Sequence, residues 1–222
     1  MSNVTRVSLW GFVNAYLVAE DDGLTLIDTT MAQGARKILA AAELIGSPIT
    51  RILLTHAHGD HVGGLDRLSA ELPDAEVIIS ARDARLLKKD TSLDPGEPDR
   101  KPRGDYRGAK TDPTRTVGDG DMVGSLLVIA NPGHTPGHIA LLDDRDGTLL
   151  CGDTYSTLGG VATSARRNPR FPFVFMGTWD PPKVIRSARR LRELEPRRLA
   201  PGHGRIREQP LAEMDAAIAR VS

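Results

Sequence analysis

Histidine and aspartate gather in a few short segments of this sequence, and the grouping is its clearest sign of chemistry. The segments are Thr55-His56-Ala57-His58-Gly59-Asp60-His61, Gly133-His134-Thr135-Pro136-Gly137-His138, Cys151-Gly152-Asp153-Thr154 and Pro201-Gly202-His203-Gly204. Together they hold all six histidines of the chain. Imidazole and carboxylate donors with almost no cysteine are typical of hydrolytic zinc, not of structural zinc or iron–sulfur clusters. The pattern therefore predicts a metal-dependent hydrolase.

The spacing of these donors predicts two neighbouring metal positions. Alternate residues of an extended segment project to one side, so His56 and His58 can reach the same ion. The expected ligands are His56, His58 and His134 for the first ion, Asp60, His61 and His203 for the second, and Asp153 as a bridge. Two-metal hydrolases hold their ions about 3.5–4 Å apart, and a bridging hydroxide between them would be the nucleophile. Scattered packing histidines or a purely structural site would not explain four donor segments that consume every histidine.

The metals themselves would be two divalent ions. Zinc fits the donor set best, and iron or manganese remain alternatives. Asp60, besides binding the second ion, is placed to orient the nucleophile or to carry its proton to the leaving group.

Composition limits the class of protein and its partners. A chain of 222 residues can bury a core of ordinary size, and we expect one domain over residues 1–222. Lys plus Arg and Asp plus Glu both number 29, so no net field favours nucleic acid or an anionic membrane. The single cysteine excludes an internal disulfide framework and suits a reducing cytoplasm. No apolar run approaches the roughly 20 residues that cross a bilayer. We expect a small-molecule substrate, with a homo-oligomer allowed.

Strands and helices are expected to alternate along the chain. The expected strands are 15–20 and 24–28 as a hairpin, then 51–55, 76–80, 126–130, 139–143, 148–151 and 198–200. The expected helices are 31–45, a segment reaching about residue 72, 182–195 and a closing helix from 210. Each donor segment begins where an expected strand ends, so the ligands should share one rim of the fold.

One segment departs from this alternation. Residues 88–116 are rich in charge, Pro and Gly and have no apolar period, which predicts a long surface loop. Loops of this length are usually lids, interface elements or disordered, and a plain solvated excursion is the alternative.

In order along the chain, these motifs resemble those of the metallo-β-lactamase superfamily of hydrolases. The resemblance rests on His56-x-His58-x-Asp60-His61, then His134, Asp153 and His203, with Leu26-Ile27-Asp28-Thr29 upstream, and covers about residues 14–203. It implies an α/β fold of the αββα type: two mixed β-sheets face to face, helices outside, and a dinuclear site at one edge. It also implies that Asp28 supports the histidine loop rather than binding metal. His138 resembles the second histidine of the family's His-Thr-Pro-Gly-His stretch, which implies a supporting role.

The family's diversity leaves the substrate open, since one fold hosts many reactions. Hydrolysis of a carboxylic ester, lactone or thioester is the preferred hypothesis. Departures from particular subgroups narrow the choice: no cysteine replaces Asp153, and His58 stands where diiron oxidoreductases of the family carry glutamate. Only about 19 residues follow His203, which disfavours a glutathione thioesterase with its helical extension. An iron-dependent persulfide dioxygenase and a β-lactam or phosphodiester hydrolase remain alternatives.

Four features outside the donor set have two interpretations each. Tyr155 could donate to the oxyanion of a tetrahedral intermediate, although lactonases of the family carry their tyrosine one position later, or it could be core. Cys151 is expected to be a buried thiol rather than a ligand. If residues 171–175 are extended, their three phenylalanines share one face, as core or as a pocket wall. The arginines of 186–198 suggest a solvated face paired with Glu193 and Glu195, rather than nucleic-acid binding.

Overall fold

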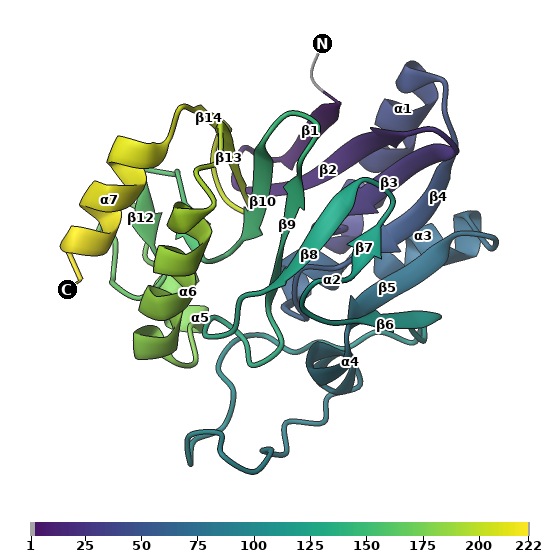
Figure 1. Cartoon of the computed structure of the whole chain (residues 1–222). Helices are drawn as coiled ribbons and strands as arrows, with labels where there is room; N and C mark the ends of the chain where they lie inside the picture. The colour runs from purple at the N-terminus through teal and green to yellow at the C-terminus, as the bar shows by residue number, and fades with distance from the viewer. Residues whose placement is uncertain (1–2, 222) are drawn as a thin grey trace.

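Two six-stranded β-sheets lie face to face in the structure, a computed structural model that describes residues 3–221 (Figure 1). The first sheet has the order β1 (Val4–Leu9), β2 (Val13–Glu20), β3 (Gly23–Ile27), β4 (Ile49–Leu53), β5 (Glu76–Ser80) and β6 (Arg115–Val117). Its first three strands are antiparallel and its last four are parallel. The antiparallel part forms because a tight turn joins β2 to β3, whereas each parallel connection needs a longer crossover.

The second sheet is also mixed. Its order is β14 (Arg207–Glu208), β13 (Arg198–Pro201), β10 (Thr148–Gly152), β9 (Ile139–Asp143), β8 (Leu126–Ala130) and β7 (Met122–Val123). Strands β10 and β13 are parallel, and the other pairs are antiparallel. A small separate pair is formed by β11 (Tyr155–Ser156) and β12 (Ala162–Thr163). The predicted fold of two mixed sheets is confirmed.

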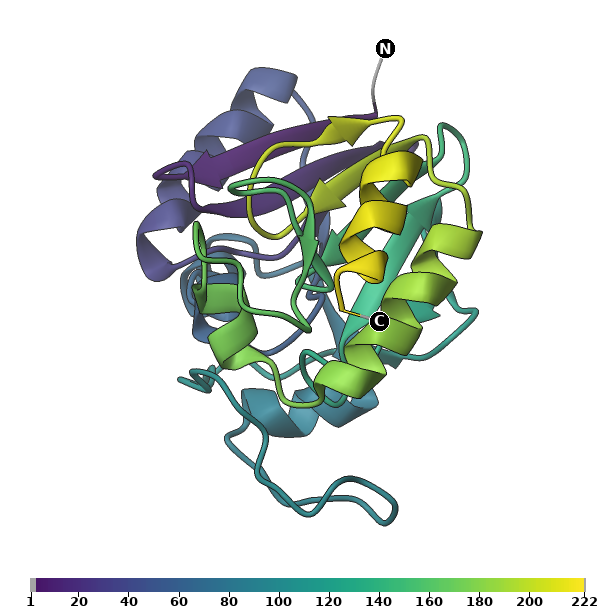
Figure 2. The same cartoon turned by 90° about the vertical axis from the view of Figure 1, so that its left-hand side faces the viewer.

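Helices cover both outer faces, so the layers run helix, sheet, sheet, helix (Figures 1 and 2). The helical segments are η1 (Ala32–Gly34), α1 (Ala35–Ile45), α2 (Gly59–Val62), α3 (Leu65–Glu71), α4 (Ala81–Leu87), α5 (Phe173–Gly177), α6 (Pro181–Glu193) and α7 (Leu211–Ala219). Helices α1, α3 and α4 share a core with the first sheet, and α6 and α7 share one with the second.

Period-two alternation along the strands builds these layers. In β5, Ile78 packs between the two sheets, while its neighbours Val77 and Ile79 face the helices. In β9, Leu141 points into the space between the sheets and Ala140 points to the helices outside. Since successive side chains of a strand point to opposite faces, apolar residues on both faces predict a sheet buried on both sides.

Local signals explain most element ends. Gly46 adopts a left-handed conformation and ends α1, as the Gly46-Ser47-Pro48 sequence predicts. The Asp180 carboxylate accepts the amide of Lys183 and begins α6, with prolines in its first turn. The predicted helix 31–45 is instead a 3₁₀ turn followed by α1, and the predicted helix reaching residue 72 is two short helices, α2 and α3.

Two helices were not predicted. Helix α4 begins at Ser80, whose hydroxyl accepts the amide of Asp83, a capping interaction that the Ser80-x-x-Asp83 spacing encodes. The segment 171–176 is not extended as supposed, because Phe173–Gly177 forms the short helix α5. The shared face proposed for its phenylalanines was therefore wrong: Phe171 is buried, whereas Phe173 is exposed.

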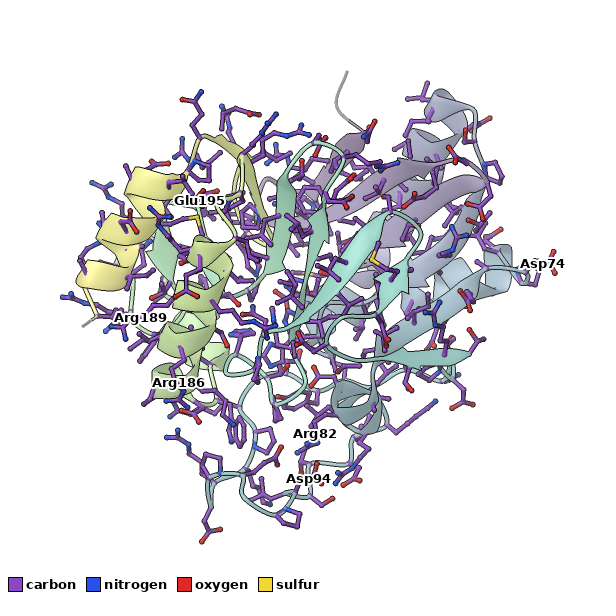
Figure 3. The ribbon with its side chains drawn as sticks, viewed as in Figure 1. Asp74, Arg82, Asp94, Arg186, Arg189 and Glu195 are labelled. Carbon is purple, nitrogen blue, oxygen red and sulfur yellow. The ribbon has the colours of Figure 1, made fainter. Side chains whose placement is uncertain are left out.

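The long segment between α4 and β6 is an extended loop that ion pairs fasten to α4 (Figure 3). Arg82 pairs with Glu97 at 2.8 Å and lies 3.4 Å from Asp94, and Arg85 pairs with Asp90 at 3.0 Å. The end of the predicted loop differs from expectation, because Arg115–Val117 joins the first sheet as β6. The loop is therefore attached at both ends and along its length.

The arginines of α6 lie on the outer side of the molecule, where Figure 3 labels Arg186 and Arg189. Their partners differ from the predicted ones: Arg190 pairs with Asp119 at 2.9 Å and Arg192 with Asp215 at 2.6 Å. Glu195 only approaches Arg192, at 4.0 Å. Among residues 3–221, no helix has the length and apolar character needed to cross a bilayer.

Candidate metal centre

The donor residues converge on one rim because several strands end there. Strands β8, β10 and β13 run in one direction in the second sheet, so their carboxyl ends lie at the same edge. His134, Asp153 and His203 follow these ends, and the loop after β4 of the first sheet brings in His56 and His58. Their ligand atoms lie close together, in three groups within 4.8 Å: His56, His58 and His134; His56, His61 and Asp153; and Asp60, His61 and His203.

The three imidazoles of the first group each have one nitrogen fixed by the protein. His58 Nε2 donates to the Arg103 carbonyl at 2.9 Å, which leaves the Nδ1 lone pair facing His134 Nε2 at 3.0 Å. The other two donate through Nδ1 to hydroxyl oxygens, His134 to Thr178 and His56 to Thr55, each at 3.0 Å. Because each hydroxyl donates its own proton elsewhere, it can only accept, and the tautomers are set.

The two imidazoles of the third group, His61 and His203, are oriented in the same way. His61 Nδ1 lies 2.8 Å from the Asp28 carboxylate, and His203 Nδ1 donates to the Phe12 carbonyl at 2.8 Å. Their Nε2 atoms turn inward, 3.4 Å and 3.2 Å from the carboxylate oxygens of Asp153. Thus all five imidazoles have one nitrogen oriented by a neighbouring group and turn the other toward the same cluster of donors.

The imidazoles of the first group differ in charge from His61 and His203 of the third group. Burial lowers the pKa of His56, His58 and His134, so these imidazoles are neutral near pH 7. Burial also acts on His203 and His61, but nearby carboxylates outweigh it: the pKa of His203 rises to about 10 and that of His61 lies well above its ordinary value. The carboxyl pKa values of Asp60 and Asp153 fall below their ordinary range, because the imidazoles outweigh the effect of burial.

These residues fit a pair of divalent cations. His56 Nε2, His61 Nε2 and Asp153 Oδ1 are buried without a hydrogen-bond partner, an expensive arrangement unless something else binds them. Asp153 Oδ2 lies 3.4 Å from His134 Nε2 and 3.2 Å from His203 Nε2, so this carboxylate stands between the two groups. Ligands at about 2.1 Å from a tetrahedral ion lie about 3.4 Å apart, close to these separations.

Two residues expected to support the ligands make contacts of that kind. The Asp28 carboxylate accepts the Thr55 amide and hydroxyl, both at 2.8 Å, besides facing His61. His138 Nε2 accepts the backbone amide of Asp153 at 3.0 Å. The proton of His138 must then sit on Nδ1, the nitrogen that faces Asn131.

Asp83 is a supporting residue that sequence reasoning missed. It is fully buried at the start of α4 and accepts the Ala57 amide at 3.0 Å, the Thr135 hydroxyl at 2.7 Å and the Gly137 amide at 2.7 Å. Burial raises its pKa to about 6, although these donors oppose the rise. Ala57 lies between two donor histidines and Thr135 follows a third, so one carboxylate ties two ligand loops together. Only the helix-capping spacing from Ser80 marks it in the sequence.

The long loop also takes part in the site. Besides the Arg103 carbonyl on His58, the Asp105 carbonyl accepts the Gly59 amide at 2.8 Å, and the Tyr106 ring lies 5.0 Å from that of His58. Gly104 permits this approach: a Cβ there would lie 2.0 Å from His58 Nε2, and its φ is +114°. The loop is therefore not a plain solvated excursion, since it orients a donor residue.

Tyr155 does not belong to the site, and its predicted catalytic role was wrong. Its side chain is buried in the core under α6, and its hydroxyl donates to the Ala188 carbonyl at 2.8 Å. It lies in β11, outside the two large sheets, and its ring packs in the core that α6 and α7 share with the second sheet. Cys151 shares that core as a buried thiol whose pKa burial raises, as expected.

The site opens into a cavity of about 240 Å³. Its lining residues are His58, Asp60, His134, Asp153 and His203, then Gly104 and Asp105 of the long loop, and Phe173, Val174, Met176 and Gly177 of α5. A small hydrophilic reacting group can therefore reach both groups of donors from solvent.

Comparison with known proteins identifies the family. The sequence pattern of the metallo-β-lactamase superfamily matches residues 9–203, so the chain belongs to this superfamily. It is 44% identical to the uncharacterized protein YobT of Bacillus subtilis (strain 168), over 93% of this chain and 89% of that protein. It is also 37% identical to a hydroxyacylglutathione hydrolase of Rhodospirillum rubrum, over 60% of this chain but only 43% of that protein. The chain thus spans about half the length of such hydrolases.

Solved structures agree with this assignment. TTHA1623 in a di-iron-bound form has a TM-score of 0.68 and 30% identity, covering 93% of this chain and 96% of that one. The BLEG-1 B3 metallo-β-lactamase has a TM-score of 0.71 at 20% identity, with 96% of both chains covered, which shows a shared fold.

Removing the Asp83 carboxylate should loosen both ligand loops. In Asp83→Ala, two buried amides and a hydroxyl lose their acceptor. We expect the free energy of unfolding to fall by about 3–5 kcal/mol, since each unpaired buried group costs about 1–3 kcal/mol. Urea unfolding with a chelator present measures this, and Asp74→Ala at an exposed turn is the matched control. A decrease in the free energy of unfolding equal to that of the control would contradict the proposal that Asp83 holds the two ligand loops together.

Adding a methyl group at Gly104 should displace His58 or the loop. We expect Gly104→Ala to weaken zinc binding about 10- to 100-fold, the usual effect of losing a partner that orients a ligand. Gly96→Ala is the matched control, because Gly96 lies in the same loop with φ +87° but has open space where its Cβ would be. Chelator competition gives the affinities, and equal affinities in the two variants would exclude the proposed orienting contact.

Proposed function

We propose that this protein is a dinuclear metallohydrolase that cleaves a carboxylic ester, lactone or thioester. The observation that carries the proposal is the orientation of five buried imidazoles, each held at one nitrogen and turned with the other toward a cluster that also contains the carboxylates of Asp60 and Asp153. The proposed ligands are His56, His58 and His134 for one ion, Asp60, His61 and His203 for the other, and Asp153 between them.

The donor set suits zinc, with iron or manganese as alternatives. Two bound divalent cations supply Lewis acidity toward a carbonyl oxygen and lower the pKa of water enough for attack near neutral pH. The protein residues have two further functions. They form the cavity that admits the reacting group, and their hydrogen bonds hold the donor imidazoles in a fixed orientation.

Asp60 is the residue best placed to orient the attacking water. Its side chain is 35% exposed, it lines the cavity, and its depressed pKa keeps it ionised near pH 7. An ionised carboxylate accepts a hydrogen bond from an attacking water and so orients it. Its oxygen lies 3.4 Å from His203 Nε2, which fixes its position.

A substrate panel tests the reaction class. We expect the zinc-loaded protein to turn over esters, lactones or thioesters in preference to β-lactams and phosphodiesters. Turnover of β-lactams or phosphodiesters alone would contradict the proposed bond type. Oxygen consumption with a persulfide by an iron-loaded sample, without any hydrolysis, would instead establish the dioxygenase alternative.

Asp60→Ala should lose activity while keeping the fold. We expect kcat to fall by about a thousandfold, because the variant lacks a proposed metal donor and the group that orients water. The melting temperature should change little, since Asp60 is partly exposed. Asp74→Ala, at an exposed turn that Figure 3 labels at the edge of the molecule and outside the donor set and the cavity lining, is the matched control. Full turnover of metal-loaded Asp60→Ala would contradict the assigned role.

Metal binding should release protons from one ligand group only. His203, with a pKa of about 10, is protonated in the metal-free protein below that pH, so binding there displaces a proton and strengthens as pH rises. Calorimetry near pH 7.5 in buffers of different ionisation enthalpy counts the protons. We expect His203→Gln to release about one proton fewer than the unaltered protein, and His134→Gln, which replaces a neutral imidazole, to release the same number. Equal release by all three proteins would contradict this charge assignment.

A further inference from the structure

Large apolar side chains border the cavity on one side. Phe173 and Met176 line it, yet 66% and 63% of their surfaces are exposed. Phe171 lies next to them, with its ring 5.5 Å from that of Phe173 and 5.2 Å from that of His203. Phe12, from the turn between β1 and β2, stacks on Phe171 at 6.4 Å and is 52% exposed. These residues, Phe12, Phe171, Phe173 and Met176, are called the apolar rim below.

Packing of the fold does not require the exposed members of this rim. In α5 only Val174 is buried, so Phe173 and Met176 contribute little to the core. Exposed apolar side chains that are contiguous and adjoin a cavity are typical of a ligand-binding surface. Phe12 is joined to the metal centre, because its backbone carbonyl accepts the imidazole proton of His203.

The size of the cavity indicates what the rim contacts. About 240 Å³ is below the roughly 300–1,000 Å³ that encloses a drug-sized ligand, so the cavity holds little more than the reacting group. The rest of a substrate must then lie outside the cavity, over the residues that border it. The charged residues of the described lining include carboxylates, Asp60, Asp105 and Asp153, but no lysine or arginine. The side of the lining that α5 forms is apolar, with Phe173, Val174 and Met176.

We propose that the substrate carries an apolar carbon chain next to its scissile bond, and that this chain lies over Phe173, Met176 and Phe12. The inference rests on the proposed ester, lactone or thioester hydrolysis and narrows its substrate class. The chain loses water on the side that faces the rim, which supplies binding energy that grows with its length.

Two ester series test this proposal with the zinc-loaded protein, one with acyl chains and one with alkyl leaving groups from two to eight carbons. We expect kcat/KM to rise about twofold per methylene in at least one series, about half the effect of complete burial. Phe173→Ser and Met176→Gln should flatten that dependence. Met122→Gln is the matched control, because Met122 is also exposed but lies on edge strand β7 outside the cavity lining.

A binding measurement separates this inference from the proposed reaction. Straight-chain hydroxamates from acetyl to octanoyl bind metals without being hydrolysed, and calorimetry gives their dissociation constants. We expect octanohydroxamate to bind at least about tenfold more tightly than acetohydroxamate, with most of that gain lost in Met176→Gln and kept in Met122→Gln.

Each outcome then decides one claim. No dependence on chain length in either ester series or in the hydroxamates would overturn the apolar contact even if esters are hydrolysed. A dependence that survives both rim substitutions would overturn its placement on α5. If no ester, lactone or thioester is hydrolysed, the proposed function fails, and the hydroxamate series alone still supports or overturns the rim as an apolar binding surface.

Discussion

The structure depends on holding five imidazoles and two carboxylates at one rim with their possible metal-binding atoms close together. Buried polar atoms without partners are costly. Such a cluster is therefore stable only when surrounding groups hydrogen-bond to its members and a ligand binds the atoms that point inward. The protein meets the first requirement with a separate acceptor for each imidazole: two hydroxyls, two backbone carbonyls and the Asp28 carboxylate. The inward atoms that remain, such as His56 Nε2 and Asp153 Oδ1, match what divalent cations bind.

Charge divides the centre into two unequal halves. The group of His56, His58 and His134 is neutral and depends on burial, whereas His61 and His203 are compensated by Asp60 and Asp153. Without metal, imidazolium charges balance the carboxylates. Two sheets packed through a continuous core provide the rigidity that such tolerances demand.

Support for the centre comes from elements that carry no ligand. Asp83 of α4 ties the loop of His56 and His58 to the loop of His134, and the Arg103 carbonyl of the long loop fixes the tautomer of His58. The same loop is fastened to α4 through Arg82. Helix α5 adds an apolar border on another side of the cavity. The donor loops, the long loop and α5 thus together surround the cavity.

The sequence by itself predicted the alternation of strands and helices and the candidate donor residues, because strand alternation and histidine spacing are local patterns with strong physical causes. The family and its sandwich of two mixed sheets were predicted from the resemblance of the ordered motifs to those of the superfamily. The sequence did not determine the roles of Tyr155, Asp83 or Phe173, whose spacing fits several environments. Tertiary structure decided these: the path of the chain beyond β10 turned Tyr155 into the core under α6, and the packing of α4 brought Asp83 beneath two loops about 26 and 52 residues away. Contacts between residues so far apart depend on how whole elements pack, and no local pattern encodes that packing.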